Sequence, residues 1–275
     1  MKERSGIETH PHTVGSDKPF FGVMVALGSV YVLLVGAMLV ADASFTTWDH
    51  IADALSRKEI RYAIWFSLLS CTLTTILALW AAIPIGYLLA RFEFPGRGFL
   101  NALVDVPIVL PPLVIGISLL ILFNTAPGRA FEDGVTPITY AIPSVIIAQF
   151  AVACAFAVRA MVSAFERTDP RREQVALTLG CTRSQAFFSV VLPEARSGVI
   201  AAAMLAWARA LGEFGPILVF SGATRMKTEV LPTSVFLELS IGNVEAAVAI
   251  SLLMVTMAVV VLLVTRWLGV RHIGS

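Results

Sequence analysis

Charged residues are scarce in this chain of 275 residues, where Asp, Glu, Lys and Arg together make up 14% of the sequence. Water-soluble domains carry about a quarter charged residues, and the mean hydropathy here is +0.82. The composition therefore excludes an ordinary soluble domain. The net charge is only +1, so nothing in the charge balance indicates a nucleic-acid partner.

Cysteine is also rare. Cys71 and Cys154 lie in apolar runs and Cys181 lies in a polar segment, an odd and scattered set that does not predict a disulfide framework. No Cys/His cluster has the spacing of a metal site, and the apolar runs hold no catalytic set such as H-E-x-x-H. We therefore expect no bound metal, no bound cofactor and no enzymatic activity in this chain itself.

Lysine occurs only four times, and no lysine follows a glycine. A Walker A loop needs a lysine directly after a glycine, because glycine amides cradle the phosphates of ATP while the lysine neutralises them. The chain therefore lacks the element that binds ATP in this way. If ATP drives the protein, a separate subunit hydrolyses the ATP and must bind the cytoplasmic face of this chain.

Long apolar runs hold most of the hydrophobic residues. A helix of about 20 apolar residues crosses a bilayer, and six runs are long enough: 20–41, 62–90, 100–123, 138–165, 199–220 and 244–268. The expected fold class is an all-α membrane protein with about six transmembrane helices. The first run exceeds the core of a signal peptide, so we expect an uncleaved span. Prolines interrupt the third run and predict a kinked helix there.

An even number of spans places both termini on one side of the membrane. With a cytoplasmic N-terminus, twelve of the 20 Lys and Arg residues are inside, counting Arg266 at the inner end of the last run, six fall in outside segments and two fall within other spans. This bias favours that orientation. We predict a cytoplasmic tail at 1–18 and a membrane domain at 19–270, in the cell (inner or plasma) membrane with both termini cytoplasmic.

The largest cytoplasmic segment would be residues 166–197. Its pattern predicts two short helices, the first capped by an aspartate before a proline and ended by a glycine. A capping box opens the second helix, which a proline is expected to stop. In chain order these residues are Asp169, Pro170, Gly180, Thr182, Gln185 and Pro193.

Ionisable residues inside the predicted spans are few. Arg209 and Glu213 are four residues apart and can pair on one helix face. One interpretation is an intramembrane pair that fixes helix packing near a pore. The other is that the two residues line the pathway or gate, with Arg209 meeting an anionic substrate.

Residues 166–197 resemble a loop of binding-protein-dependent ATP-binding-cassette (ABC) importers, whose membrane subunits carry the motif E-A-A-x3-G-x9-I-x-L-P. Here Q-V-A at 174–176 is followed by a glycine at 180 and by V-V-L-P at 190–193, with the spacing kept. Three positions depart from the motif, and a glutamate precedes the first. The resemblance implies that the residues coupling the chain to an ATPase are Glu173, Gln174, Val175, Ala176, Gly180, Val190, Leu192 and Pro193.

Two further segments resemble the molybdate, tungstate and sulfate permease subunits within this group. Residues 107–116 are similar to their V-L-P-P-x-V-x-G stretch, and residues 208–215 are similar to their A-R-x-L-G-E-F-G stretch. The resemblance covers about residues 54–268 and is closest to the molybdate members. Pro216 follows the second stretch, at a position where these permeases are expected to have a small residue. The departure puts in question the geometry of a gate at this place. The candidate pathway or gate residues are Arg209, Glu213, Pro111 and Pro112.

The resemblance implies the transmembrane domain of a type I importer, similar to molybdate and maltose permeases. The implied assembly is a homodimer around a pore, with a pair of ATPase subunits that bind ATP and Mg and an extracytoplasmic oxyanion-binding protein. The implied function is import of molybdate or tungstate. Import of sulfate, thiosulfate or another anion is the alternative, and a stand-alone secondary transporter or channel is a more distant one.

Overall fold

The computed structural model describes residues 17–271, and these residues form helices and connecting turns without a strand. The chain divides into two compact units, Met1–Phe45 and Thr46–Ser275. In the first unit, helix α1 (Lys18–Phe45) contains the first apolar run, with Lys18 near its start and Asp42 near its end. The predicted tail at 1–18 lies almost entirely outside the described residues.

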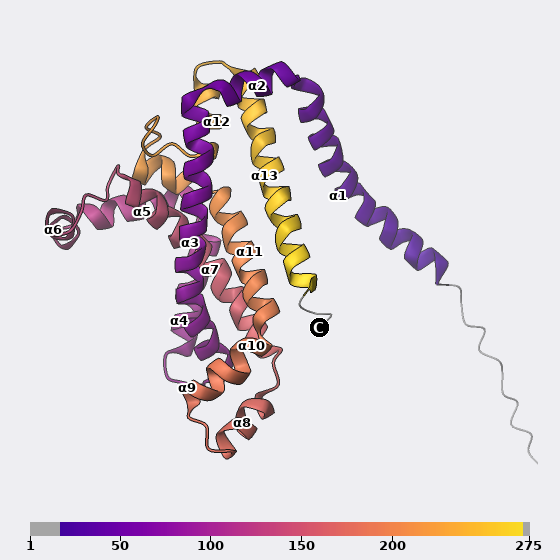
Figure 1. The fold of residues 1–275 in the computed structure, drawn as a ribbon, viewed down its shortest axis with the longest axis vertical. Coiled ribbons are helices and arrows are strands. Elements are labelled where there is room, and N and C mark those ends of the chain that lie inside the picture. Colours follow the sequence, from indigo (N-terminus) through magenta and orange to yellow (C-terminus); the bar gives the residue numbers. More distant parts are fainter. Residues whose placement is uncertain (1–16, 272–275) are drawn as a thin grey trace, which may run out of the picture. The chain divides into compact units, whose positions relative to one another are not determined.

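Three helices form the core of the second unit (Figure 1): α3 (Lys58–Arg91), α7 (Ile142–Glu166) and α11 (Arg196–Leu211). Their contact surfaces are rich in buried alanine, including Ala78, Ala157 and Ala202. Small residues let helix backbones approach closely within a membrane. The approach is closest at Gly198, where an added Cβ would lie 2.2 Å from that of Ala164. The alanine-rich fifth run therefore serves close helix packing within the chain.

A buried glutamine connects these three helices. The Gln149 side chain of α7 accepts a hydrogen bond from the Thr74 hydroxyl of α3 at 3.1 Å and donates one to the Ala210 carbonyl of α11 at 3.2 Å. Gln149 is 1% exposed. A buried amide needs such partners because an unpaired polar group in an apolar interior costs several kcal/mol, on the order of 2–7.

The third apolar run is two helices, α4 (Arg97–Val109) and α5 (Pro112–Asn124), and the chain bends by 113° between them. The single kinked helix expected here is therefore wrong. Leu110 is extended, with φ −67° and ψ 139°, because the residue before a proline is disfavoured in helical conformation. Pro111 and Pro112 supply no backbone N–H to continue the α4 ladder, whereas Pro107 is accommodated inside α4.

The fifth run also breaks earlier than expected. Helix α11 ends at Leu211, residues 212–214 are not helical, and residues 215–216 lead into the π-helix η2 (Ile217–Ser221). The continuous span expected at 199–220 is therefore wrong. Gly212 lies at the break, and glycine does not favour a helix interior.

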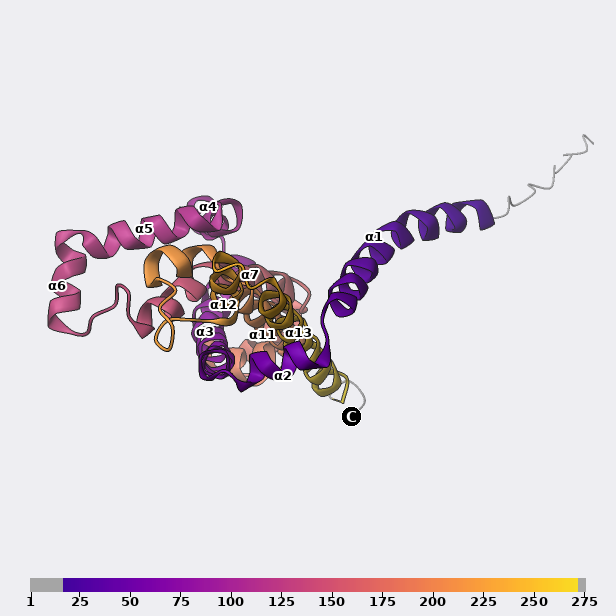
Figure 2. The same ribbon diagram turned by 90° about the horizontal axis from the view of Figure 1, so that it is seen from above.

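The remaining apolar run matches α13 (Val244–Arg271), and three short helices were not expected: α2 (Trp48–Ser56), α6 (Ala126–Gly134) and α12 (Leu231–Ser240). Within the second unit, α6 lies at the far side from α13, at the end of the arm formed by α5 (Figure 2). Of the described helices, four are long and apolar enough to cross a membrane, and six crossings result if each bent pair counts as one.

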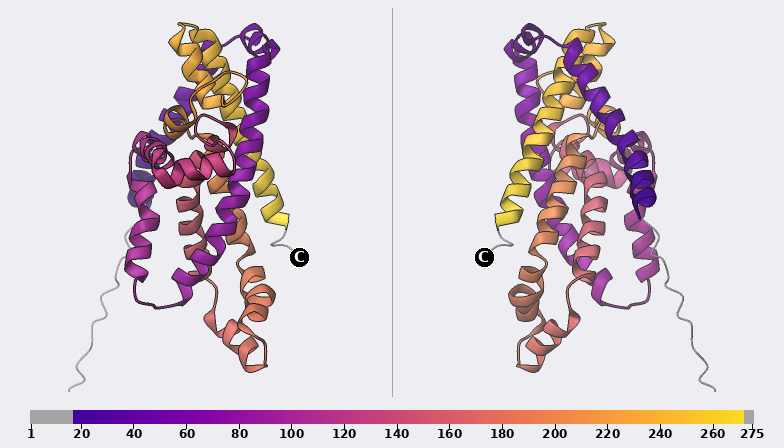
Figure 3. Two further views of the ribbon diagram at one scale, coloured as in Figure 1. Left: turned by 90° about the vertical axis from the view of Figure 1, so that its left-hand side faces the viewer. Right: turned by 90° about the vertical axis from the view of Figure 1, so that its right-hand side faces the viewer.

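Residues 166–197, called the coupling segment below, contain α8 (Pro170–Thr178), α9 (Arg183–Ala186), the π-helix η1 (Phe187–Val191) and α10 (Leu192–Glu194). The segment lies at one end of α3, and α2 and α12 lie at the other end (Figures 1 and 3). The helical stretch that α9 opens ends at Glu194, one residue after Pro193 and close to the end expected there. Pro193 itself lies in α10, just after the π-helix.

Candidate functional site

The first helix of the coupling segment has both of its expected ends. Asp169 Oδ1 accepts a hydrogen bond from the Arg171 N–H at 2.9 Å, which satisfies one of the free donors at the start of α8. At the other end Gly180 has φ +93°, and the Cys181 N–H donates to the Ala176 carbonyl at 3.1 Å. This left-handed ending suits glycine, because a Cβ there is strained.

The capping box that opens α9 is also confirmed. The Gln185 N–H donates to Thr182 Oγ1 at 3.3 Å, and the Thr182 N–H donates to Gln185 Oε1 at 2.8 Å. The two short helices are therefore positioned by local sequence, as expected.

The motif residues divide into a buried face and an exposed face. Glu173 and Ala176 are each 8% exposed, whereas Val175 is 56% exposed and Leu179 is 80% exposed. Gln174, Gly180 and Pro193 are exposed, and Val190 and Leu192 are half-buried. Val175 and Leu179 are four residues apart and so share one side of α8. The tip of the segment thus presents apolar side chains outward, and Phe188 of η1 is exposed as well.

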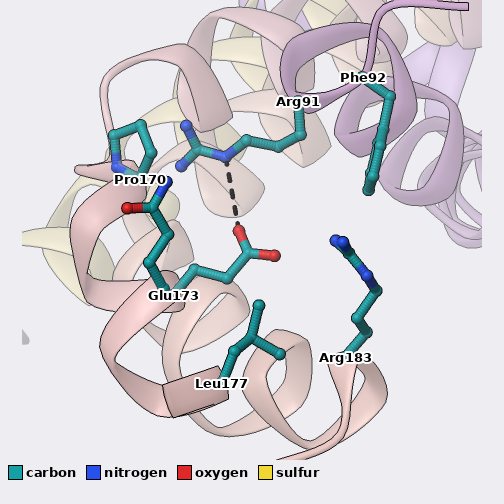
Figure 4. A pocket seen from close by; sticks show the side chains of 7 residues that line it. Arg91, Phe92, Pro170, Glu173, Leu177 and Arg183 are labelled. Atoms are coloured by element: carbon teal, nitrogen blue, oxygen red, sulfur yellow. Dashed lines mark ion pairs between the residues drawn. The ribbon is translucent and has the colours of Figure 1, made fainter.

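Glu173 points inward, toward the end of α3 (Figure 4). The Tyr87 hydroxyl donates to Glu173 Oε1 at 2.5 Å, and Arg91 Nε lies 3.8 Å from Glu173 Oε2. Arg91 Nη2 also donates to the Thr168 carbonyl at 2.9 Å. The sequence analysis did not assign Tyr87 or Arg91 a role. Their spacing of four residues at a helix end was the available signal.

A pocket opens beside this cluster, between the end of α3 and the coupling segment. Phe92 and Arg183 face each other across it (Figure 4), with the Arg183 guanidinium carbon 5.5 Å from the centroid of the Phe92 ring. The residues that line the pocket are Arg91, Phe92, Pro170, Glu173, Gln174, Leu177 and Arg183.

The second group of candidate residues gathers where α5 begins. Pro111 and Pro112 line a pocket together with Arg209 and Glu213. Gly116 and Gly215 allow this contact, because a Cβ on Gly116 would lie 2.7 Å from Pro216 Cα and one on Gly215 would lie 3.0 Å from the Leu113 nitrogen. The structure therefore brings the two similar stretches together, and Pro216 packs directly on Gly116.

The expected pairing of Arg209 with Glu213 is confirmed. Arg209 Nη1 lies 2.5 Å from Glu213 Oε2, with 25% of the arginine side chain exposed and 1% of the glutamate side chain. The guanidinium also lies over the Phe156 ring of α7, 5.7 Å from its centroid. This group lies at the end of α11 that is remote from the coupling segment, so the two sets of candidate residues form separate sites.

A further intramembrane pair was missed. Arg159 of α7 contacts Asp105 of α4 through two bonds of 2.5 and 2.6 Å, and it also donates to the Asn101 side chain at 3.0 Å. Arg159 and Asp105 are 54 positions apart, so spacing in the sequence gave no indication of the pair.

Charged side chains also meet at the end of the unit opposite the coupling segment. Glu238 of α12 accepts hydrogen bonds from Arg57 at 3.1 Å, Arg225 at 2.8 Å and Asn243 at 2.8 Å. Nearby Glu229 is fully buried, and burial raises the pKa of its carboxyl despite a hydrogen bond from Ser234. Among the described residues, no group of three or more His, Cys, Asp or Glu side chains could hold a metal ion.

Comparison with known proteins identifies the group to which this architecture belongs. Residues 82–272 match the family described as "Binding-protein-dependent transport system inner membrane component". The sulfate transport system permease protein CysT of Salmonella typhimurium is 32% identical, over 86% of this chain and 89% of that protein.

Molybdenum-group permeases are similar to the same degree. The molybdate/tungstate transport system permease protein WtpB of Thermococcus kodakarensis is 35% identical, over 80% of this chain and 83% of its own. The molybdenum transport system permease protein ModB of Mycobacterium tuberculosis is 32% identical, over 92% of this chain and 95% of that protein.

A solved bacterial alginate ABC transporter, in complex with an alginate-bound periplasmic protein, has a similar fold. The TM-score is 0.76 at 14% identity, covering 94% of this chain and 96% of that one. At this identity the likeness speaks for the fold alone. The all-α architecture, the two similar stretches packed together and the family match over residues 82–272 agree, and the chain belongs to the binding-protein-dependent transport system inner membrane components, with the transmembrane fold of a type I ABC importer.

Proposed function

We propose that this chain is the permease subunit of an ATP-driven importer for a tetrahedral oxyanion, with molybdate or tungstate as the cargo. Two copies would form the pore, a pair of separate ATPase subunits would bind ATP and Mg, and an extracytoplasmic binding protein would deliver the anion. Both termini would lie in the cytoplasm. The observation that carries the proposal is the coupling segment, which presents an apolar tip outward while its base is bonded to the transmembrane helices.

The exposed tip supports a docking role for this segment. Val175, Leu179 and Phe188 expose more than half of their surface at the end of the unit, and exposed apolar patches commonly mark protein–protein contacts. Gly180 holds the turn between α8 and α9, so the shape of this surface depends on one backbone conformation. An ATPase subunit with an apolar groove fits this surface.

The pair of Arg209 and Glu213 supports an anion pathway at the end of α11. A lone arginine in a membrane would bind a passing dianion strongly, because charge–charge attraction is weakly screened there. Pairing with a buried glutamate offsets this attraction. The pathway would thus admit an oxyanion without trapping it, and specificity would rest mainly with the binding protein.

Sulfate import is the alternative cargo, because CysT-type sulfate permeases are about as similar to this chain as the molybdenum-group permeases. Uptake of labelled molybdate, tungstate and sulfate into liposomes that contain the chain, its ATPase and its binding protein decides between them. ATP-dependent uptake of molybdate or tungstate in preference to sulfate supports the proposal. Uptake of sulfate alone would show that sulfate, not molybdate or tungstate, is the cargo. Anion flux through the chain without ATP or partners would contradict the importer assignment.

The coupling role is tested by Gly180→Val. A branched side chain at φ +93° is strained by about 1–2 kcal/mol, so we expect weaker co-purification with the ATPase and reduced uptake. Gly96→Val is the matched control, since Gly96 also has φ +93° and open space around its Cβ position, but lies in the turn before α4. Undiminished complex formation and uptake by Gly180→Val would contradict the coupling assignment.

A further inference from the structure

The end of α3 and the coupling segment are joined by a small polar cluster that the family match does not describe. Tyr87 and Arg91 are four residues apart on α3 and so lie on the same side of that helix. Both reach the same carboxylate, Glu173 of α8, and each contacts a different oxygen of it. Glu173 retains only 10% of its side-chain exposure, so water competes little for these contacts.

Arg91 extends the cluster to a third element. Its Nη2 donates to both the carbonyl and the hydroxyl oxygen of Thr168, at 2.9 and 2.5 Å, and Thr168 lies two residues after the end of α7. The Thr168 hydroxyl in turn donates to the Phe165 carbonyl in the last turn of α7 at 2.8 Å. One guanidinium therefore joins α3, the end of α7 and the first helix of the coupling segment.

The Tyr87 ring reinforces the same junction. It packs edge-on against Phe165 of α7 and Phe187 of η1, with ring centroids 5.7 and 4.7 Å away. Edge-to-face pairs at these distances are attractive. Tyr87 thus touches α7 through its ring, η1 through its ring and α8 through its hydroxyl.

We propose that Tyr87 and Arg91 are positioning residues that tie α8 to α3 and α7, so that displacement of the coupling segment is passed to the transmembrane helices. This inference rests on the proposed function. When the tie is loosened, the coupling segment can move with its ATPase while the core helices stay in place. The consequence is ATP hydrolysis that no longer drives uptake.

The other contacts of α8 do not replace this tie. Arg172 pairs with Glu194 of α10 at 3.3 Å, but 66% of the arginine side chain is exposed, and exposed ion pairs contribute little. That pair also stays within the coupling segment. Among the side-chain hydrogen bonds and ion pairs of α8 in the described chain, those of Glu173 reach the transmembrane helix α3.

The test uses the full importer in proteoliposomes and measures ATP hydrolysed per anion taken up. The variants are Tyr87→Phe, which removes one hydroxyl and keeps the ring, and Glu173→Gln, which removes the charge and keeps the shape. We expect each to raise this ratio by about tenfold, the factor for losing one hydrogen bond to a charged group, with the ATPase still bound. Combining both changes should add little, because both act on one cluster.

Tyr62→Phe is the matched control, because Tyr62 lies near the start of the same helix and its hydroxyl donates to the Lys227 carbonyl at the opposite end of the unit, at 2.8 Å. We expect its ratio to match that of the unmodified importer. An unchanged ratio in Tyr87→Phe, including one in which hydrolysis and uptake fall equally, would contradict the proposed role of this cluster. Release of the ATPase from the variant would contradict it as well. Failure of the unmodified chain to take up anion with ATP would instead contradict the proposed function.

Discussion

At the residue scale, this chain places several ionisable and polar groups where water is scarce, and each has named partners. Glu229 is the clearest case outside the spans. It is fully buried, accepts a hydrogen bond from Ser234 at 2.9 Å and lies 3.5 Å from Arg225. Burial outweighs these contacts and raises its pKa above the ordinary value of 4.5, since burial disfavours the charged form.

This shift predicts a pH-dependent gain for Glu229→Gln. A carboxyl whose pKa is raised on folding binds its proton more tightly in the folded state, so its contribution to stability is lost as pH rises through the raised value. Glutamine has no such loss. We therefore expect the melting temperature of the variant, relative to the unmodified chain, to increase as the pH rises above the ordinary carboxyl value of 4.5. Glu93→Gln, which changes an exposed carboxyl, is the control, and a relative gain that shrinks with rising pH would contradict the prediction.

Gln149 offers a second prediction at this scale. Gln149→Leu keeps similar volume but removes the hydrogen bonds to Thr74 and to the Ala210 carbonyl. We expect a loss of about 1 kcal/mol, typical of a polar contact between membrane helices, measured as a lower unfolding midpoint in detergent. Thr72→Val is the control, because the exposed Thr72 hydroxyl bonds only within its own helix. Equal stability of the two variants would show that the glutamine does not hold the three helices together.

At the element scale, the broken third and fifth runs are the main departure from a simple bundle. The bend between α4 and α5 places the start of α5 against residues 212–216, after α11. The two broken runs therefore pack against each other just beyond their breaks. Non-helical backbone inside a membrane is tolerated where protein covers it or where it lines a water-filled cavity.

Gly116→Ala tests this contact between elements. The added methyl group would lie 2.7 Å from Pro216 Cα, so we expect a loss of about 1–3 kcal/mol from overpacking and a lower uptake rate. Gly98→Ala is the matched control, because Gly98 lies in the first turn of α4 with nothing within 4 Å of its Cβ position. There alanine should be neutral or mildly stabilising. The stability of both variants is measured by thermal unfolding. A Gly116→Ala chain as stable as the Gly98→Ala chain would rule out the close contact.

At the scale of the whole molecule, the orientation in the membrane follows from where the coupling segment lies. Residues 166–197 and the helix α12 are at opposite ends of the second unit (Figure 3). If the coupling segment meets an ATPase, it faces the cytoplasm, and α12 with its charged neighbours faces the other side. This agrees with the excess of Lys and Arg in the segments expected inside.

The native cysteines allow a direct measurement of this orientation. Cys181 is exposed beside Gly180, Cys71 is buried and Cys154 is half-buried. In cells that express the chain without its partners, we expect a membrane-impermeant maleimide to modify Cys181 only after the cytoplasmic side is opened. Ser240→Cys in a Cys181→Ser chain should react from the outside. The reverse pattern would show that the orientation is inverted.

Several features could be determined from the sequence alone because they depend on neighbours in the chain. The capped start of α8, the glycine at its end and the capping box of α9 are all local patterns, and the structure has each of them. The pairing of Arg209 with Glu213 spans one helical turn and was predictable for the same reason. The spacing of the coupling motif indicated the family to which the chain belongs, and the match over residues 82–272 confirms it.

Only the tertiary structure decided which distant residues meet. Tyr87 and Glu173 are 86 positions apart, and Gln149 lies 75 positions from Thr74, separations at which periodicity carries no information. The two broken runs were misjudged because hydropathy records which residues prefer lipid, not whether their helix is continuous. The close backbone contact between Gly116 and Pro216, which joins the two broken runs, exists only once the helices have packed.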